Sequence, residues 1–295
     1  MHGLTPVFAT PEALPTRRRR AGNALAVLAG AVLAVLVMVA IAAPLIAPYG
    51  ARDGSILDSL SPPIFDSAGT WEHVLGTDSL GRDIFSGVIH GSRISLLVGI
   101  VTVLGAGLIG TGIGLIAGYF RGWVDEIVMR IVDIQMAFPF IILAITIMFI
   151  LGRGVLNVIV VLMVTSWPLY ARVVRAEVLR LRESEFVVAA RVVGCSRARI
   201  VFRHILPNVV TPLIVVASFA VPQMIIFEAG LSFLGVGMPP QVLSWGTMIA
   251  DGRSYLDQAW WISTFPGLAI MLAVLSINIL GDWFRDRLDP RLRNL

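Results

Sequence analysis

The chain contains no lysine, and all 23 of its basic residues are arginine. This absence excludes a standard Walker A nucleotide site, because that phosphate-binding loop needs its lysine to reach the β- and γ-phosphates. If ATP drives this protein, the nucleotide must therefore be bound by another subunit.

Cysteine and histidine are scarce as well. Cys195 is the single cysteine, which excludes an intrachain disulfide and a multi-cysteine metal or cluster site. The four histidines, at positions 2, 73, 90 and 204, lack metal-ligand spacing. The apolar runs contain no H-E-x-x-H or G-x-S-x-G motif and no pair of aspartates. These absences argue against an intramembrane enzyme.

Charge is the third scarcity. Only 14% of the 295 residues are charged and 57% are hydrophobic, with a mean hydropathy of +0.84. A soluble domain carries about 25% charged residues, so we expect an all-α polytopic membrane protein. Six apolar runs predict six transmembrane helices, at residues 21–49, 94–120, 134–152, 154–171, 209–227 and 261–281.

The first two apolar runs carry further signals. Ala40-Ile41-Ala42 offers a signal-peptidase site in the first run, but the run is longer than a signal peptide, which favours an uncleaved helix. The second run is uncharged, and glycines recur along it from Gly105 to Gly118, which predicts close packing against neighbouring helices. Between these two runs, we expect residues 50–92 to form a small folded segment and not an unstructured linker.

Residues 229–250 are uncharged, but glycines and Pro239-Pro240 disfavour a continuous seventh helix there. We expect a surface loop or a partly re-entrant segment. Six crossings place eighteen arginines on the side of the termini and five on the other side. The positive-inside rule then predicts that both termini and the arginine-rich segment after the fourth run are cytoplasmic.

Eight arginines lie between Arg172 and Arg203, and burying all of them at the bilayer centre would cost roughly 20–28 kcal/mol. The segment is nevertheless patterned as two short amphipathic helices. Gly194 predicts the stop and restart between them, and Pro207-Asn208 the end of the second. Their apolar stripes are Phe186, Ala189, Ala190 and Val193, and then Ile200, Val201, Ile205 and Leu206. This segment is either a docking surface or an ordinary cytoplasmic loop.

Four polar side chains lie in or beside the apolar runs, where burial in lipid is costly. Asp133 and Glu228 are expected near helix ends, where snorkelling or capping is the leading interpretation. Gln223 and Asn278 either line a translocation path or bond to neighbouring helices.

The segment AARVVGCSRARIVFRHILPN resembles the cytoplasmic EAA loop of permease subunits from bacterial ABC importers. Ala189, Ala190, Gly194, Leu206 and Pro207 match its pattern. Val188 replaces the family's glutamate and His204 replaces an isoleucine, so any contact assigned to that acid is in doubt.

Three further segments, 73–99, 228–253 and 260–291, resemble the C-type permease of dipeptide and oligopeptide importers. The resemblance covers nearly the whole chain from about residue 20. It implies the type I ABC importer permease fold in the bacterial cytoplasmic membrane. The resemblance implies four partners: a B-type permease, cytoplasmic ATPases that hold ATP and magnesium, an extracytoplasmic binding protein and a peptide substrate. No nucleic acid or cofactor is expected on this chain. The residues expected to couple to the ATPases are Ala189, Ala190, Gly194, Cys195, Ser196, Arg197, Leu206 and Pro207.

The expected organisation is a cytoplasmic tail (1–20), a first transmembrane helix (21–49), an extracytoplasmic segment (50–92), a five-helix core (93–282) with a coupling loop at 172–207, and a cytoplasmic tail (283–295). Related C-type subunits serve nickel or glutathione, so both stay open as alternative substrates. A passive channel is the alternative from another class.

Overall fold

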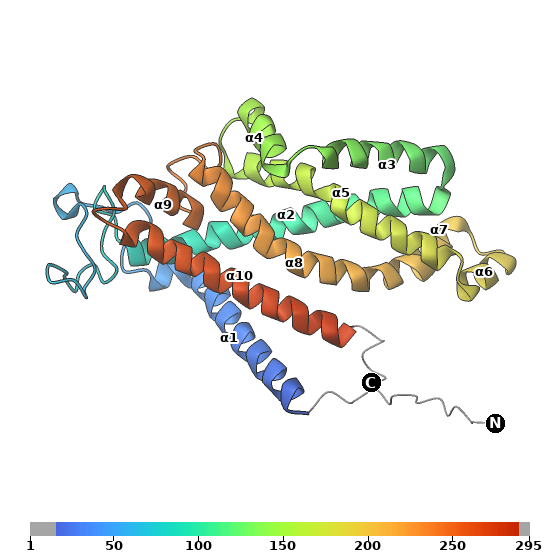
Figure 1. Ribbon diagram of the computed structural model, residues 1–295, viewed down its shortest axis with the longest axis horizontal. Coiled ribbons are helices and arrows are strands. Elements are labelled where there is room, and N and C mark those ends of the chain that lie inside the picture. Colours follow the sequence, from blue (N-terminus) through green and yellow to red (C-terminus); the bar gives the residue numbers. More distant parts are fainter. Residues whose placement is uncertain (1–15, 289–295) are drawn as a thin grey trace, which may run out of the picture.

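The computed structural model describes residues 16–288, and within that range the secondary structure is helical apart from two isolated bridges (Figure 1). Of the expected tails at 1–20 and 283–295, residues 1–15 and 289–295 lie outside the described residues. The principal helices are α1 (Thr16–Ile46), α2 (Ile84–Phe120), α3 (Gly122–Ala137), α4 (Phe140–Leu151), α5 (Val155–Arg182), α6 (Glu185–Val192), α7 (Arg197–Arg199), α8 (Leu206–Phe233), α9 (Trp245–Gly252) and α10 (Trp261–Leu288). Three short turns complete the set: η1 (Ile56–Asp58), η2 (Ile200–Ile205) and η3 (Arg253–Tyr255).

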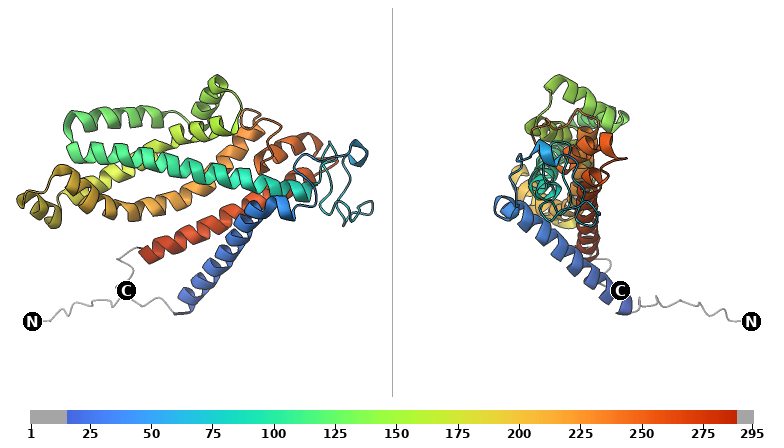
Figure 2. Two further views of the ribbon diagram at one scale, coloured as in Figure 1. Left: turned by 180° about the vertical axis from the view of Figure 1, so that it is seen from behind. Right: turned by 90° about the vertical axis from the view of Figure 1, so that its left-hand side faces the viewer.

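Five helices are long and apolar enough to span a membrane, or six if the bent pair α3–α4 counts as one span. The helices run broadly along the long axis of the molecule, with the loop between α1 and α2 at one end and α6 at the other (Figure 1). α1 and α10 lie together and lean away from the remaining helices toward the α6 end (Figure 2).

The seam between α2 and α5 is the most extensive helix contact in the bundle, and glycine makes the close approach possible. A Cβ at Gly110 would lie 2.5 Å from the Trp167 carbonyl oxygen, and one at Gly114 would lie 2.6 Å from that of Ala171. Spaced four residues apart, these glycines share one face of α2 and let the two backbones approach. The predicted close packing is confirmed there, whereas Gly112 faces open space.

The third apolar run is not one straight helix. α3 and α4 meet at an angle of 94° around Phe138 and Pro139. Proline cannot donate the backbone hydrogen bond that would continue α3, and it disfavours helical geometry in Phe138, which is extended. In α3 only Val132 is buried, so this helix lies against the outside of α2 and α5.

The expected helix end at Pro207-Asn208 was wrong, because the chain stays helical from Arg197 to Phe233. The turn η2 is a π-helix, in which the Leu206 N–H reaches the Val201 carbonyl. This wider turn relieves the clash that a proline ring makes with the preceding turn, and Pro207 sits in the first turn of α8, where its missing N–H costs little.

Residues 229–250 are not a surface loop. α8 continues to Phe233, a turn follows, and α9 packs between α2, α8 and α10 with Trp245 fully buried. Eight residues are too few to cross a bilayer, so the interpretation as a partly re-entrant segment agrees better with the fold. The last helix is also longer than expected and ends at Leu288, inside the segment predicted to be a tail.

The loop between α1 and α2 is ordered by its own hydrogen bonds. Asp83 caps α2 by accepting from the Ser86 N–H at 2.7 Å, and its other oxygen lies 3.1 Å from His73 Nδ1. The Trp261 indole N–H donates to the Thr77 carbonyl, which ties the loop to α10. These contacts move the start of the second helix to Ile84, ten residues before the apolar run begins.

Candidate functional site: an exposed tip and a lateral cavity

Residues 185–205 form a folded projection, here called the α6–η2 tip, at the ends of α2, α5 and α8 (Figure 1). Its inner face packs as a small core of its own. Val187, Ala190, Ile200 and Ile205 are buried against the final turns of α2 and α5. The tip is therefore an ordered unit fixed to three long helices, and it does not behave as a free connector.

Gly194 creates the bend between α6 and α7. Its φ is +84°, a region in which only glycine is comfortable. The Gly194 N–H donates to the Arg191 carbonyl and the Cys195 N–H to that of Ala190, which is the Schellman ending of a helix. Ser196 then caps α7 through the Arg199 N–H. The predicted stop and restart is confirmed.

The outer face of the tip is apolar and uncovered. Val192 and Val193 are each 83% exposed, and Phe202 is 66% exposed. Of the predicted first stripe only Ala190 is buried, whereas Phe186 and Val193 face outward. Large apolar side chains gathered on a projection are typical of a surface that a partner covers.

The eight arginines divide into two groups. Four are engaged within the chain. Arg172 pairs with Asp133 at 2.7 Å, Arg175 with Asp125 at 2.5 Å and Arg180 with Glu177, while Arg182 donates to the Tyr119 carbonyl. Within residues 16–288, Arg191, Arg197, Arg199 and Arg203 have no ion pair. The unpaired group lies on the tip, so positive charge accompanies the exposed valines.

The residues expected to couple to an ATPase do not share one face. Ala189, Gly194, Ser196, Arg197 and Pro207 are exposed, Cys195 and Leu206 are half-buried and Ala190 is buried. Val188, which replaces the family's glutamate, is 43% exposed on the same side as the outer valines.

A cavity of about 410 Å³ opens beside the α3–α4 bend, between α5 and α8. Aromatic side chains line it, including Phe140 and Phe227, whose rings stack at 4.0 Å. Gln223 is exposed in this cavity. Asn278 lies on α10, half-buried, and is not among the lining residues. The structure therefore does not bring the two predicted pathway residues together.

Glu228 lies in the last turns of α8, near a helix end as expected, but the expected snorkelling or capping role is wrong. It lies fully buried within α8, and three serine hydroxyls donate to its carboxylate. Two of those serines, Ser95 and Ser244, are distant from Glu228 in sequence. The residues around Glu228 therefore do not predict its hydrogen-bond partners. Asp133 also lies in the last turns of its helix, α3, but it is exposed and pairs with Arg172.

Residues 110–294 match the family described as the binding-protein-dependent transport system inner membrane component. The chain belongs to that family. Residues 16–63 also match the N-terminal transmembrane domain of oligopeptide transport permease C. The binding-protein-dependent permeases are multi-pass components of ABC transporters, so the membrane location and the predicted resemblance are confirmed.

Curated relatives span almost the whole chain. It is 40% identical to the dipeptide transport system permease protein DppC of Alkalihalophilus pseudofirmus, over 92% of this chain and 88% of that protein. It is 42% identical to a putative peptide transport system permease protein of Brucella suis, over 99% of this chain and 94% of that protein. It is also 43% identical to the glutathione transport system permease protein GsiD of Pectobacterium atrosepticum, over 94% of this chain and 90% of that protein.

Among solved structures, an inward-facing MetNI methionine ABC transporter matches with a TM-score of 0.59 and 20% identity, over 70% of this chain and 98% of that chain. Identity this low carries the fold alone. The predicted fold of an ABC importer permease is thereby confirmed. Like its relatives, this binding-protein-dependent permease is a transport subunit.

Proposed function

We propose that this chain forms half of the translocation pathway of an ATP-driven peptide importer, with a B-type permease forming the other half. The α6–η2 tip carries the proposal. It presents an apolar outer surface with four unpaired arginines, and it is packed onto the ends of α2, α5 and α8. A partner that pushes on this surface therefore acts on three long helices at once.

The partner that fits this surface is a cytoplasmic ATPase. The chain has no lysine for a phosphate loop, so the nucleotide and its magnesium ion must be held elsewhere. The arginine distribution supports a cytoplasmic location for the tip and for both termini. A groove with apolar and acidic side chains would complement the exposed valines and arginines. Closure of the ATPases would then move the tip and, with it, the helices of the permease.

The substrate class rests on relatives. Those compared are described as carrying dipeptides, peptides or glutathione, which is itself a small peptide. An extracytoplasmic binding protein would deliver the substrate to the 50–92 side. We assign the cavity with Gln223 to the pathway, because it combines aromatic walls with uncharged polar groups. The roles of Gln223 and Asn278 can be tested together, by replacing each with cysteine and measuring how accessible it is to a thiol reagent during transport. Glutathione remains the second substrate candidate, since the 43% identical relative carries it.

The experiment that tests the docking role is the substitution Val193→Asp, followed by co-purification of the ATPases with the permease pair. An aspartate on the outer face removes apolar contact and opposes the acidic groove that the arginines imply. We expect the retained ATPase to fall by about tenfold or more, with normal membrane insertion.

The matched control is Leu57→Asp, because Leu57 is also exposed, at 96%, but lies at the opposite end of the molecule. This variant should retain its ATPases. Equal loss in both variants, or normal retention in Val193→Asp, would show that the tip does not bind the ATPase.

A further inference from the structure

Glu228 is a buried carboxylate whose hydrogen-bond partners come from three elements. Its Oε1 accepts from Ser232 Oγ at 2.9 Å, on α8 itself, and from Ser244 Oγ at 2.8 Å, at the start of α9. Its Oε2 accepts from Ser95 Oγ on α2 at 3.4 Å. A buried group with this many partners is costly to disturb, because each lost hydrogen bond leaves a buried polar atom with neither a protein partner nor water.

The same serines hold the backbone that leads into α9. Ser244 Oγ accepts from the Thr247 N–H, Ser232 Oγ from the Met238 N–H and Ser95 Oγ from the Trp245 N–H. Glu228 therefore orients three hydroxyls that in turn fix the turn after α8 and the first residues of α9. Without an acceptor at the position of Oε1, the two shortest bonds of this network are lost.

Close packing supports the same attachment. A Cβ at Gly246 would lie 2.6 Å from the Ala229 Cα and 3.1 Å from Glu228 Oε1, so α9 touches α8 backbone to backbone. The Trp245 indole N–H donates to the Val88 carbonyl on α2. The inner end of α9 is thus joined to both helices.

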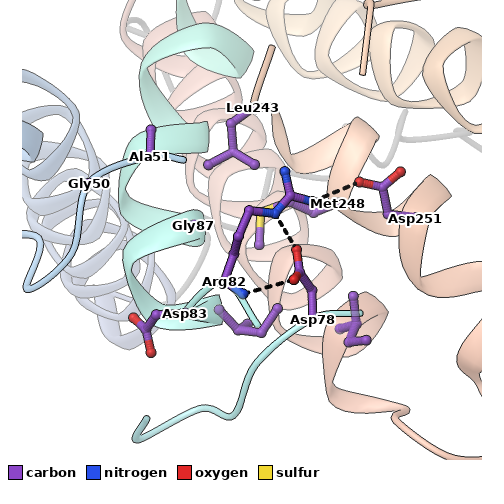
Figure 3. Close-up of a pocket in the computed structure, with 11 residues that line it drawn as sticks. Gly50, Ala51, Asp78, Arg82, Asp83, Gly87, Leu243, Met248 and Asp251 are labelled. Atoms are coloured by element: carbon purple, nitrogen blue, oxygen red, sulfur yellow. Dashed lines mark hydrogen bonds and ion pairs between the residues drawn. The ribbon is translucent and has the colours of Figure 1, made fainter. Parts of the chain in front are cut away.

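The outer end of α9 reaches the loop between α1 and α2. Figure 3 shows Arg82 between two carboxylates, with Asp78 on its own loop and Asp251 on α9. The Arg82 guanidinium lies 2.6 Å from Asp78 and 3.4 Å from Asp251. The short helix α9 therefore links Glu228 on α8 to the 50–83 segment.

The helix that carries Glu228 is continuous with the α6–η2 tip, since the chain is helical from Arg197 to Phe233. At about 1.5 Å per residue this helix is about 55 Å long. We propose that Glu228 is a positioning residue that locks α9 to α8, so that a displacement of α8 imposed at the tip also moves α9 and the 50–83 segment. The long-range part rests on the proposed function, and the lock itself does not.

The locking atom is Oε1, which accepts both short bonds. This assignment separates two substitutions of nearly equal size. Glu228→Gln keeps an oxygen acceptor in that place, and Glu228→Leu keeps the volume without any acceptor. Ser218→Ala is the control, because Ser218 is another serine on α8, whose hydroxyl donates to the Val215 carbonyl and not to Glu228.

The first measurement is backbone hydrogen exchange of residues 240–252 in the purified complex. We expect exchange about tenfold faster in Glu228→Leu and within about twofold of wild type in Glu228→Gln and Ser218→Ala. Wild-type exchange in Glu228→Leu would overturn the lock. Equal acceleration in Glu228→Gln would overturn the assignment to Oε1.

The second measurement is the stimulation of ATP hydrolysis by the binding protein in the reconstituted importer. Glu228→Leu should keep its ATPases and its unstimulated hydrolysis but lose about tenfold of the stimulation, and Glu228→Gln should restore it. Full stimulation in Glu228→Leu would overturn the long-range part. If the permease pair retains no ATPase even as wild type, the proposed function fails, whereas the exchange measurement still tests the lock.

Should Glu228→Leu fail to assemble, Ser244→Ala decides the matter. It removes one short bond to Oε1 and the cap of α9 while the carboxylate stays in place. We expect accelerated exchange at 240–252 and weaker stimulation. Wild-type values for both in an assembled complex would overturn the proposal.

Discussion

The two ends of the molecule differ in how they satisfy their charged side chains. At the loop end, Arg82 is flanked by Asp78 and Asp251, and the buried His73 and Asp83 contact each other. At the α6–η2 tip, four arginines have no carboxylate within the described part of the chain. Apolar side chains are exposed at both ends, so exposure alone does not separate them. This difference supports the proposal that a partner covers the tip.

The largest expected effect comes from Gly194→Trp at the tip. An added Cβ meets no atom within 4 Å, although the φ of +84° strains any other residue, and the indole would stand on the docking surface. We expect ATP-driven uptake to fall by about tenfold or more with normal insertion of the protein.

Gly152→Trp is the control for backbone strain. Gly152 also has a positive φ, +79°, and no atom within 4 Å of an added Cβ, but it lies between α4 and α5, away from the tip (Figure 1). This variant should retain most uptake. If both variants lose uptake equally, strain at a left-handed residue explains the loss, and the contrast between the two ends is broken.

An intermediate effect is expected at the loop end, where Asp83→Ala removes the cap of α2 and the partner of the buried His73. The free energy of unfolding should fall by about 2–3 kcal/mol. Thermal unfolding in detergent measures this, with Asp66→Ala as control, because Asp66 bonds only within an exposed turn. A loss of ATPase binding by Asp83→Ala without any loss of stability would contradict the contrast.

The smallest effect concerns Asp251. Burial raises the pKa of this carboxyl, and the neighbouring Asp78 adds to the rise, while Arg82 opposes it. Since the folded state favours the protonated form, stability decreases as the pH rises from the ordinary aspartate range through the raised pKa. Asp251→Asn should remove this dependence, so its unfolding temperature relative to wild type should increase slightly from acidic to neutral pH. A relative decrease would show that the ion pair with Arg82 dominates.

The sequence predicted what depends on local pattern and on totals. Apolar runs located the long helices, glycines in the second run predicted its close packing without naming the partner helix, and Gly194 marked the bend in the tip. It missed features that depend on distant contacts. The serines that surround Glu228 come from positions as far apart as Ser95 and Ser244, and the π-turn that carries a helix through Pro207 follows from packing of the tip.

The candidate site was predicted in its location but not in its faces. Amphipathic spacing grouped Phe186 with Ala190, yet only Ala190 faces the bundle. Which side of an eight-residue helix is covered depends on where α2 and α5 end, and the pattern of α6 alone does not contain that information.

The most direct test of the account uses the single cysteine, Cys195, which is half-buried on the tip and requires no substitution. A membrane-impermeant maleimide is applied to oriented vesicles from each side, with and without the ATPases. We predict labelling from the cytoplasmic side only, and slower labelling when the ATPases are bound. Labelling from the extracytoplasmic side, or the same rate with and without the ATPases, would contradict the account.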